Sequence, residues 1–228
     1  MSIDLKKEAA REALKLIPPG SRIGFGAGST MAHLVHLLKE EETLAASVMV
    51  LTSSFNTKNL LEQAGFVLKE TGTCATIDLY FDGCDQFDRR LNALKSGGGI
   101  HTKEKILAAM ANSLILVGDE SKFVEKLDGR YPVVVEVIPE ALAFVMEKIQ
   151  RLFHPSSSLL RMSDKKEGAV ITENGNYLID LFFTTFPEPE LLDHELNGIP
   201  GLLEHSLFYN MADRAVIAGG NGVRIIGK

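Results

Sequence analysis

Segments that favour strands alternate with segments that favour helices over roughly the first 125 residues, and this alternation restricts the possible folds more than any other feature. The expected strands are short runs rich in apolar residues, at 22–26, 48–52, 66–69, 77–81 and 114–117. The expected helices lie between them, at 31–39, 57–64 and 102–111. Strands joined through helices run parallel in one sheet, so we predict a parallel sheet with helices on both faces.

The order of elements changes in the second half of the chain. An expected strand at 133–138 and a helix at 140–153 precede two strands that flank Glu173-Asn174-Gly175-Asn176, a strong hairpin signal. A further helix is expected at 188–196. This order resembles a split βαβ sandwich, which is a compact unit of its own.

The domain boundaries follow from where the parallel pattern stops and where it resumes. Two final apolar strands, at 215–218 and 223–226, are expected to return to the first part of the chain. We therefore predict an α/β protein whose parallel-sheet, Rossmann-like main domain comprises residues 1–128 and 206–228. A smaller α+β (ferredoxin-like) domain, residues 129–205, is inserted near the C-terminus.

The charge balance and the cysteine count restrict the partners and the compartment. The chain has 24 basic and 30 acidic residues, and this acidic balance argues against nucleic acid as a partner. No apolar run is long enough to span a bilayer, and the N-terminus lacks the apolar core of a signal peptide. Cys74 and Cys84 are too few for a secreted disulfide scaffold. We expect a soluble cytoplasmic protein without a membrane partner.

The first motif that carries chemistry is the turn Gly24-Phe25-Gly26-Ala27-Gly28-Ser29-Thr30. Glycines let main-chain N–H groups approach an anion, and the start of the following helix favours negative charge. The motif is neither a Walker loop nor the dinucleotide fingerprint, since Ser29 stands where the third glycine belongs. The alternative is a tight strand-to-helix turn with Ser29 as the N-cap.

The second motif, Asp82-Gly83-Cys84-Asp85, ends an apolar strand. The carboxyl ends of parallel strands line the ligand crevice, so two carboxylates there can act as acid and base or hold a cation. Asp88 adds a third acid. In the alternative interpretation, the aspartates form only local hydrogen bonds of a turn.

The third motif runs from Lys95 through three consecutive glycines to Lys105. Consecutive glycines indicate close approach of the main chain to another group. Thr102 is the expected N-cap, which places Glu104 in the first helical turn. Lysine, bare main chain and glutamate together resemble an oxyanion site beside a base. A flexible loop, with Glu104 complementing the helix dipole, is the alternative.

Together these motifs resemble the type A ribose-5-phosphate isomerase family. The family's glycine turn, its D-G-A-D motif and its K-G-G-G…T-x-E-K segment are similar, in the same order, to the three motifs above. Further matches lie at 119–122 (D-x-S-K), 135–139 (V-E-V-I-P), 172–176 and 199–201. The likeness runs over nearly the whole chain.

The resemblance implies an aldose–ketose isomerase, an intramolecular oxidoreductase of the non-oxidative branch of the pentose phosphate pathway. Such an enzyme interconverts D-ribose 5-phosphate and D-ribulose 5-phosphate through a cis-enediolate, without metal or other cofactor, as a homodimer or homotetramer. By motif position, Glu104 is the proton-transferring base, and Asp82, Asp85 and Lys95 are the other catalytic residues. The implied substrate-binding residues are Lys7, Ala27, Gly28, Ser29, Thr30, Gly83, Cys84, Ser96, Gly97, Gly98 and Lys122.

Four positions depart from the family pattern. Cys84 replaces an alanine, Gln86 stands where an acid commonly follows, Ser96 replaces a glycine and Ala27 replaces a hydroxyl residue. All the proposed charged groups remain, so we expect activity.

The pKa of Glu104 is left open, because the helix N-terminus and Lys95 lower it whereas burial raises it.

Besides a different isomerase or acyl-transfer enzyme of the same broad fold, which fold alone does not exclude, two other functions remain alternatives. One is a sugar-phosphate sensor of the same fold that binds without turnover, and retention of Glu104 with both acids argues against it. The other is a Mg²⁺-dependent phosphatase or transferase built on Asp82, Asp85 and Asp88, which a chelator would inactivate.

Overall fold

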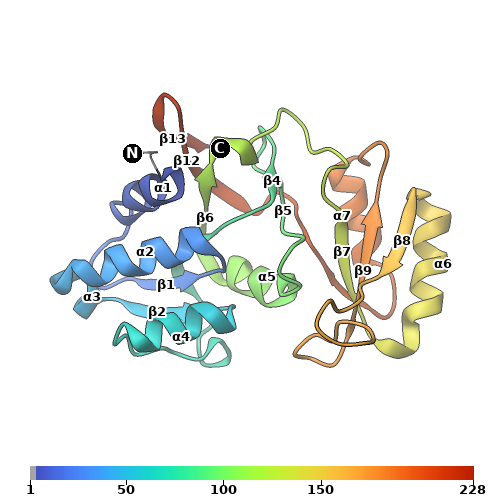
Figure 1. The fold of residues 1–228 in the computed structure, drawn as a ribbon, viewed down its shortest axis with the longest axis horizontal. Helices are drawn as coiled ribbons and strands as arrows, with labels where there is room; N and C mark the ends of the chain where they lie inside the picture. The colour runs from blue at the N-terminus through green and yellow to red at the C-terminus, as the bar shows by residue number, and fades with distance from the viewer. Residues whose placement is uncertain (1–3) are drawn as a thin grey trace.

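A six-stranded sheet forms the centre of the larger part of the molecule in the computed structural model, which describes residues 4–228 (Figure 1). Its strand order is β13-β12-β6-β3-β1-β2. All neighbours run parallel except β12 and β13, which form an antiparallel hairpin at one edge. The strands are β1 (Arg22–Phe25), β2 (Met49–Thr52), β3 (Ile77–Asp82), β6 (Ala111–Asp119), β12 (Ala212–Gly219) and β13 (Gly222–Gly227). The predicted parallel core and the return of the last strands to it are confirmed.

Helices cover both faces of this sheet because its strands are apolar on both faces. Along β6, Ile115 and Val117 point to one face and Leu114 and Leu116 to the other, as the two-residue period requires. The first face packs against α1 (Leu5–Leu14), α2 (Ser29–Glu40) and α4 (Phe55–Gln63), and the second against α5 (His101–Met110). Short α3 (Glu42–Ser47) follows α2, and a 3₁₀ turn, η1 (Thr71–Thr73), precedes β3. The strand expected at 66–69 is wrong, because this segment forms an isolated parallel bridge, between Leu68 and Val50, and not a named strand.

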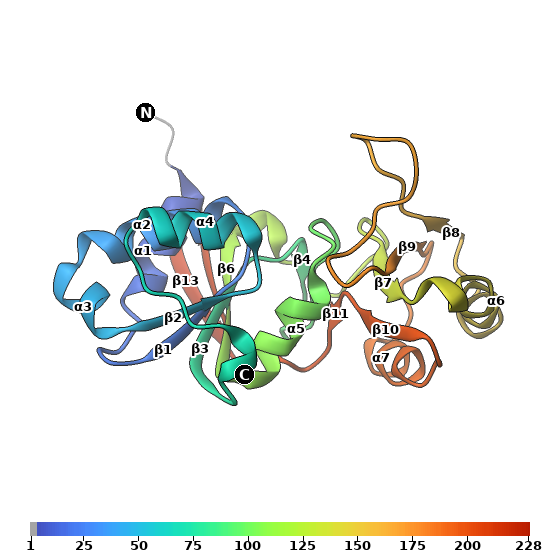
Figure 2. The same ribbon diagram turned by 90° about the horizontal axis from the view of Figure 1, so that it is seen from below.

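The smaller part of the molecule lies beside the first and contains an antiparallel four-stranded sheet (Figures 1 and 2). Its strands are β7 (Val133–Val137), β8 (Ser157–Leu160), β9 (Tyr177–Phe182) and β10 (Leu202–His205), in the order β10-β7-β9-β8. Two helices, α6 (Leu142–Phe153) and α7 (Pro189–Asn197), bury their apolar residues on one face of it. The other face is turned toward the triple-glycine loop and the start of α5, since Glu136 and Leu178 contact residues of segment 99–102.

A third, three-stranded sheet begins directly after the acidic motif, residues 82–85. It is formed by β4 (Gln86–Phe87), β5 (Ala93–Leu94) and β11 (Leu207–Phe208), in the order β11-β5-β4. The short 3₁₀ helices η2 (Glu120–Lys122) and η3 (Pro139–Ala141) follow β6 and β7. Because β4 and β5 pair Gln86 with Leu94, the residues just outside the pair, Asp82 to Asp85 and Lys95, lie close together.

The start of α5 differs from the prediction. The helix begins at His101, Ile100 occupies the N-cap position, and Thr102 lies inside the first turn. The Thr102 hydroxyl donates instead to Glu136 of β7, a partner 34 positions away that local sequence does not reveal. The N-cap prediction for Thr102 is therefore wrong, whereas Glu104 does lie in the first turn of the helix.

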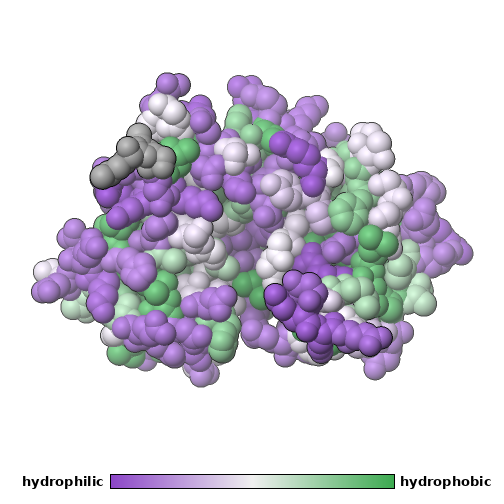
Figure 3. Space-filling model, viewed as in Figure 1, coloured by the Kyte–Doolittle hydropathy of each residue, from purple (hydrophilic) through white to green (hydrophobic). Residues whose placement is uncertain are grey.

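The surface seen in Figure 3 is mainly hydrophilic, with hydrophobic residues scattered among polar ones. Within residues 4–228, none of the helices combines the length and the apolar character needed to cross a membrane.

Candidate active site

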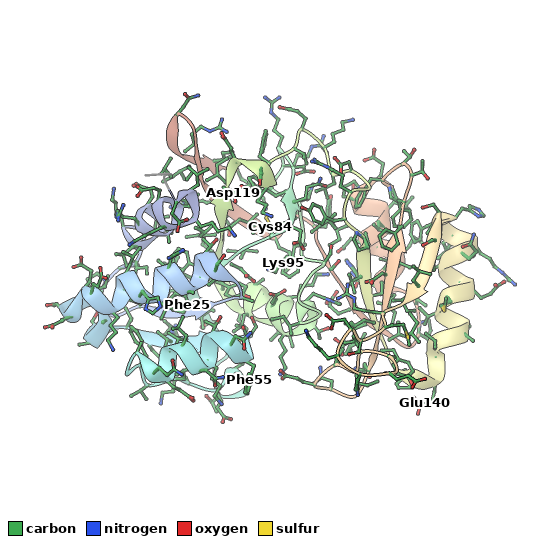
Figure 4. All side chains as sticks on the ribbon, viewed as in Figure 1. Phe25, Phe55, Cys84, Lys95, Asp119 and Glu140 are labelled. Carbon is green, nitrogen blue, oxygen red and sulfur yellow. The ribbon has the colours of Figure 1, made fainter. Side chains whose placement is uncertain are left out.

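A cavity of about 390 Å³ opens where β1, β3 and β6 end. The carboxyl ends of parallel strands meet at one edge of a sheet, which is the usual place for a ligand. Figure 4 shows Cys84, Lys95 and Asp119 gathered in this region, between the two parts of the molecule. The side chains and main chain that line the cavity come from four segments and the N-terminal helix: Lys6, Ala27, Gly28, Ser29, Thr30, Gly83, Cys84, Asp85, Lys95, Gly97, Gly98, Glu104, Val117, Gly118, Asp119 and Lys122.

The glycine turn between β1 and α2 forms one wall of the cavity. Gly28 precedes the helix with φ +95°, a conformation that favours glycine, and α2 begins at Ser29 rather than being capped by it. The Nζ atom of Lys6 donates to the Ser29 hydroxyl at 3.1 Å. A helix N-terminus, hydroxyl groups and a lysine together make this wall suitable for an anion.

A buried ion triad lies at the floor of the cavity. The Nζ atom of Lys95 is 2.8 Å from Asp82 Oδ2 and 3.3 Å from Glu104 Oε1. It also donates to the carbonyl of Gly83 at 2.5 Å. The three side chains are 6%, 1% and 6% exposed, so their charges are compensated mainly by one another.

Asp82 is fully engaged beneath the cavity rather than in its lining. Its carboxylate accepts from the main-chain N–H groups of Gly83 and Ala27 at 2.8 and 3.2 Å, and from the Tyr80 hydroxyl at 2.6 Å. A Cβ atom on Gly26 would lie 1.8 Å from Asp82 Oδ1, so the turn fits over this carboxylate only with glycine there. Asp82 therefore joins the glycine turn to Lys95.

Asp85, in contrast, lines the cavity. Its Oδ2 atom accepts from the main-chain N–H groups of Ser96 and Gly97 at 2.6 and 3.1 Å. These contacts hold the carboxylate against the triple-glycine loop, where Gly97 and Gly98 also line the cavity.

Burial decides the protonation of Glu104, which the sequence left open. Burial raises the pKa of Glu104 to about 8, against the lowering effect of the Lys95 ammonium. Burial also acts to lower the pKa of Lys95, but the charges of Asp82 and Glu104 outweigh it and hold that pKa above its usual value. The site thus pairs a permanent cation with a carboxylate of increased basicity.

Three of the predicted site residues lie outside the cavity lining. They are Asp82, described above, Ser96 and Lys7. The Ser96 hydroxyl donates to the carbonyl of Pro132 at 2.5 Å, which explains how a side chain is accommodated where the family has glycine. Lys7 is exposed on α1, and Lys6 is the lysine that reaches the cavity. The other twelve predicted residues line it.

Sequence reasoning missed four residues of the lining. Lys6 is one helical position from Lys7 and points about 100° away from it, a difference that a motif-free helix does not reveal. Val117, Gly118 and Asp119 end β6. For Asp119 the signal existed, because the D-x-S-K match with Lys122 already placed both residues at a strand end.

Asp88 and His101 lie apart from the site. The Asp88 carboxylate accepts from the main-chain N–H groups of Arg90 and Asn92, and so forms the local turn that was the alternative prediction. Across residues 4–228, no three His, Cys, Asp or Glu side chains converge as metal ligands would. His101 is buried against the carbonyl of Glu204, and burial lowers its pKa to about 4.

Comparison with known families matches most of the chain to one of them. A family model described as ribose 5-phosphate isomerase A (phosphoriboisomerase A) matches residues 49–222. A second model, the DeoR C-terminal sensor domain, matches residues 1–74. Ribose-5-phosphate isomerase A of Agrobacterium fabrum is 37% identical over 224 residues, covering 97% of this chain and 96% of the relative. That of Rhodopseudomonas palustris (strain BisB5) is 36% identical over 226 residues, covering 98% and 97%.

Solved structures share the fold over the full length. Ribose 5-phosphate isomerase A of Methanocaldococcus jannaschii superposes with a TM-score of 0.90 at 36% identity, covering 99% of both chains. A D-ribose-5-phosphate isomerase in complex with phospho-erythronic acid superposes with a TM-score of 0.92 at 34% identity, covering 100% of both chains.

Proposed function

The chain belongs to the ribose 5-phosphate isomerase A family, and we propose that Glu104 is the base with which it interconverts ribose 5-phosphate and ribulose 5-phosphate. One observation carries the assignment. Glu104 lines the cavity and is almost fully buried, and its Oε1 atom lies 3.3 Å from the Nζ atom of Lys95. A basic carboxylate thus lies beside a cation that can stabilise an oxyanion. Aldose–ketose isomerisation needs both groups.

In the proposed proton transfer, Glu104 removes the proton from C2 of open-chain ribose 5-phosphate. The electrons of the broken C–H bond form the C1–C2 double bond, and the aldehyde oxygen becomes an oxyanion of the cis-enediolate. Glu104 then returns the proton to C1, while the hydroxyl proton passes from the C2 oxygen to the C1 oxygen. The pKa of about 8 makes Glu104 a stronger base than an exposed glutamate.

Lys95 stabilises the enediolate oxygens as a fixed positive charge. Its raised pKa keeps it protonated at neutral pH, so it donates hydrogen bonds without giving up a proton. The main-chain N–H of Gly98, which also lines the cavity, is the further donor, because the N–H of Gly97 is already bonded to Asp85. Donors fixed before reaction need no reorganisation when the charge develops.

Ring opening is assigned to Asp85 rather than to Asp82. Both aspartates were candidates, but Asp85 faces the cavity whereas Asp82 is covered and accepts from Gly83, Ala27 and Tyr80. Asp85 takes the proton from the C1 hydroxyl of the closed sugar and delivers it to the ring oxygen as the bond between that oxygen and C1 breaks, which leaves the open-chain aldehyde and the ionised Asp85. Asp82 positions Lys95.

The phosphate group is assigned to the wall that the glycine turn forms. Main-chain N–H groups at Gly28–Thr30, the Ser29 hydroxyl and the side chains of Lys6 and Lys122 surround this part of the cavity. Anchoring the phosphate there fixes the reacting carbons near Glu104, and this remote binding energy favours reaction.

The finer architecture and the cellular setting are proposed together. Residues 1–128 and 206–228 form the Rossmann-like domain, and residues 129–205 an inserted ferredoxin-like domain, which the strand–helix–strand–strand–helix–strand order of β7 to β10 supports. The enzyme is cytoplasmic and works as a homodimer or homotetramer; light scattering in solution would give the number of subunits.

A sensor without turnover is the second candidate, which the match to the DeoR sensor domain favours. That match ends at residue 74, so it includes the glycine turn but not Asp85, Lys95 or Glu104. The shared part is thus the anion-binding turn, and the groups proposed for proton transfer lie beyond it.

A turnover assay separates these functions. The protein is incubated with ribose 5-phosphate in EDTA, and the ketose is measured. We expect rapid formation of ribulose 5-phosphate that the chelator does not change. Binding without product would support the sensor, and loss of activity in EDTA would support metal-dependent chemistry.

A further inference from the structure

The triple-glycine loop is part of the proposed site but has little rigidity of its own. Gly97 and Gly98 are exposed, and Gly99 has φ +67°. Consecutive glycines have the greatest main-chain freedom of any residues. Since Asp85 is held by this loop and the loop lines the cavity, some group outside the loop must fix the orientation of its peptides.

Arg161, which directly follows β8 in the smaller part of the molecule, contacts the loop from outside the cavity. Its Nη2 atom donates to the carbonyl of Ser96 at 2.8 Å, and its Nη1 atom to the carbonyl of Gly97 at 3.4 Å. Asp180 of β9 accepts from the Arg161 Nε atom at 3.0 Å. The Arg161 and Asp180 side chains are only 16% and 18% exposed, so the guanidinium is held in one orientation.

Peptide geometry determines what these contacts do. In a planar trans peptide the C=O of one residue points opposite to the N–H of the next. With the Ser96 carbonyl turned to Arg161, the Gly97 N–H must point away from it, and it is found 3.1 Å from Asp85 Oδ2. With the Gly97 carbonyl also turned to Arg161, the Gly98 N–H must point away from Arg161, and Gly98 lines the cavity.

We propose that Arg161, fixed by Asp180, is a positioning residue that orients the Ser96 and Gly97 peptides so that Asp85 is held in place and the Gly98 N–H faces the sugar. This inference rests on the proposed function of the cavity. Arg161 does not line the cavity, and its charge is paired with Asp180, so it acts through geometry. The smaller part of the molecule thereby completes the site of the larger one.

Arginine suits this position and lysine does not. The planar guanidinium presents several N–H donors in a fixed fork, which here reaches two carbonyls and one carboxylate at once. A lysine ammonium is a point charge on a flexible chain and lacks the fork. Replacement by lysine therefore keeps the charge but loses the orientation of the peptides.

The test compares Arg161→Ala, Arg161→Lys and the wild-type enzyme in isomerisation of ribose 5-phosphate. Arg151→Ala is the matched control, because Arg151 also pairs with an acid, Glu147, but on the exposed surface of α6. We expect kcat to fall about 10- to 100-fold in both Arg161 variants. The KM is expected to change less than about threefold, because the phosphate is bound at the opposite wall. Arg151→Ala should match the wild type.

Guanidinium rescue distinguishes positioning from general stabilisation. Added guanidinium ion, at concentrations below those that unfold the enzyme, should restore part of the kcat of Arg161→Ala and none of Arg161→Lys, where the side chain fills the site. Unchanged kcat in both Arg161 variants would overturn the inference, as would a loss of kcat in Arg161→Ala that guanidinium does not reverse. If the wild-type enzyme itself fails to isomerise the sugar, the proposed function fails instead.

Discussion

At the scale of single residues, Lys95 and Glu104 set the chemistry of the cavity by opposing effects on one another. Burial raises the pKa of Glu104 to about 8, and Lys95 acts to lower it. Below that pKa Glu104 is protonated and could not act as the proposed base toward the proton on C2. Burial therefore gives Glu104 the basicity that proton abstraction needs, and the positive charge of Lys95 limits how far burial raises its pKa.

A pH profile follows from this balance. We expect kcat/KM of the wild-type enzyme to rise with pH and to level off above about pH 8, as Glu104 loses its proton. In Lys95→Met the lowering effect of the cation is gone, so the rise should move to higher pH. The plateau should also fall about 100-fold or more, because an oxyanion donor is lost. Lys148→Met, on the exposed surface of α6, is the control. A pH profile of Lys95→Met that does not shift from that of the wild type would contradict the effect of Lys95 on the pKa of Glu104.

Cys84 gives a second prediction at this scale. The thiol lines the cavity, yet burial raises its pKa to about 12, so almost none of it is thiolate at neutral pH. We expect iodoacetamide to leave activity unchanged, and Cys84→Ala to have a kcat close to that of the wild type. Rapid inactivation that ribose 5-phosphate prevents and Cys84→Ala abolishes would show that the thiol is reactive.

At the scale of elements, the turn between β1 and α2 fits its neighbour only because Gly26 has no side chain. A Cβ atom there would lie 1.8 Å from Asp82 Oδ1, and Asp82 in turn holds Lys95. We expect Gly26→Ala to lower kcat at least about 100-fold and stability by about 1–3 kcal/mol. Gly72→Ala, where an added Cβ meets no atom within 4 Å, is the matched control. Equal kcat and melting temperature in the two variants would contradict this account.

The sequence predicts an element correctly where neighbouring residues alone determine it. The strand that ends at Asp82 and the first turn that holds Glu104 follow from apolar periodicity and from the glycines before the helix. The start of α5 was misplaced because the Thr102 hydroxyl bonds to Glu136, which only the folded chain brings near. Whether Lys6 or Lys7 reaches the cavity depends on which side of α1 packs against α2, and packing between the two helices sets that orientation.

At the scale of the whole molecule, the helix that carries Glu104 is joined to both parts of the structure. Its apolar residues Leu107 and Ala108 pack on the larger sheet. Its N-terminal half bonds to the smaller part, through Thr102 to Glu136 and through Lys105 to Glu204. The position of Glu104, the proposed base, therefore depends on how the two parts are held together, which no local motif shows.

Glu136 is the buried carboxylate at this junction, and it gives a prediction for stability. It accepts hydrogen bonds from Thr102, from Thr172 at 2.7 Å and from Asn176 at 2.8 Å. Burial alone would raise its pKa, but these three hydrogen bonds outweigh burial and lower it. Since the folded state favours the ionised form, this stabilisation is present at neutral pH and is lost as the pH falls through the lowered pKa.

We therefore expect Glu136→Gln to be less stable than the wild type at neutral pH, by about 1–3 kcal/mol. The difference should shrink in acid, where the wild-type carboxylate is also neutral. Thermal unfolding of both proteins across the acid range measures it, with exposed Glu147→Gln as the control. A difference that grows as the pH falls would contradict the assigned role.

The central claim is that Glu104 moves the proton between C2 and C1. The most direct measurement is the rate at which Glu104→Gln isomerises ribose 5-phosphate and exchanges the C2 proton in heavy water, followed by NMR, together with its affinity for phospho-erythronic acid. We predict a fall in both rates of about 10²- to 10⁴-fold, with affinity for phospho-erythronic acid largely kept. Wild-type rates of exchange and isomerisation in a Glu104→Gln enzyme that still binds phospho-erythronic acid would contradict the account.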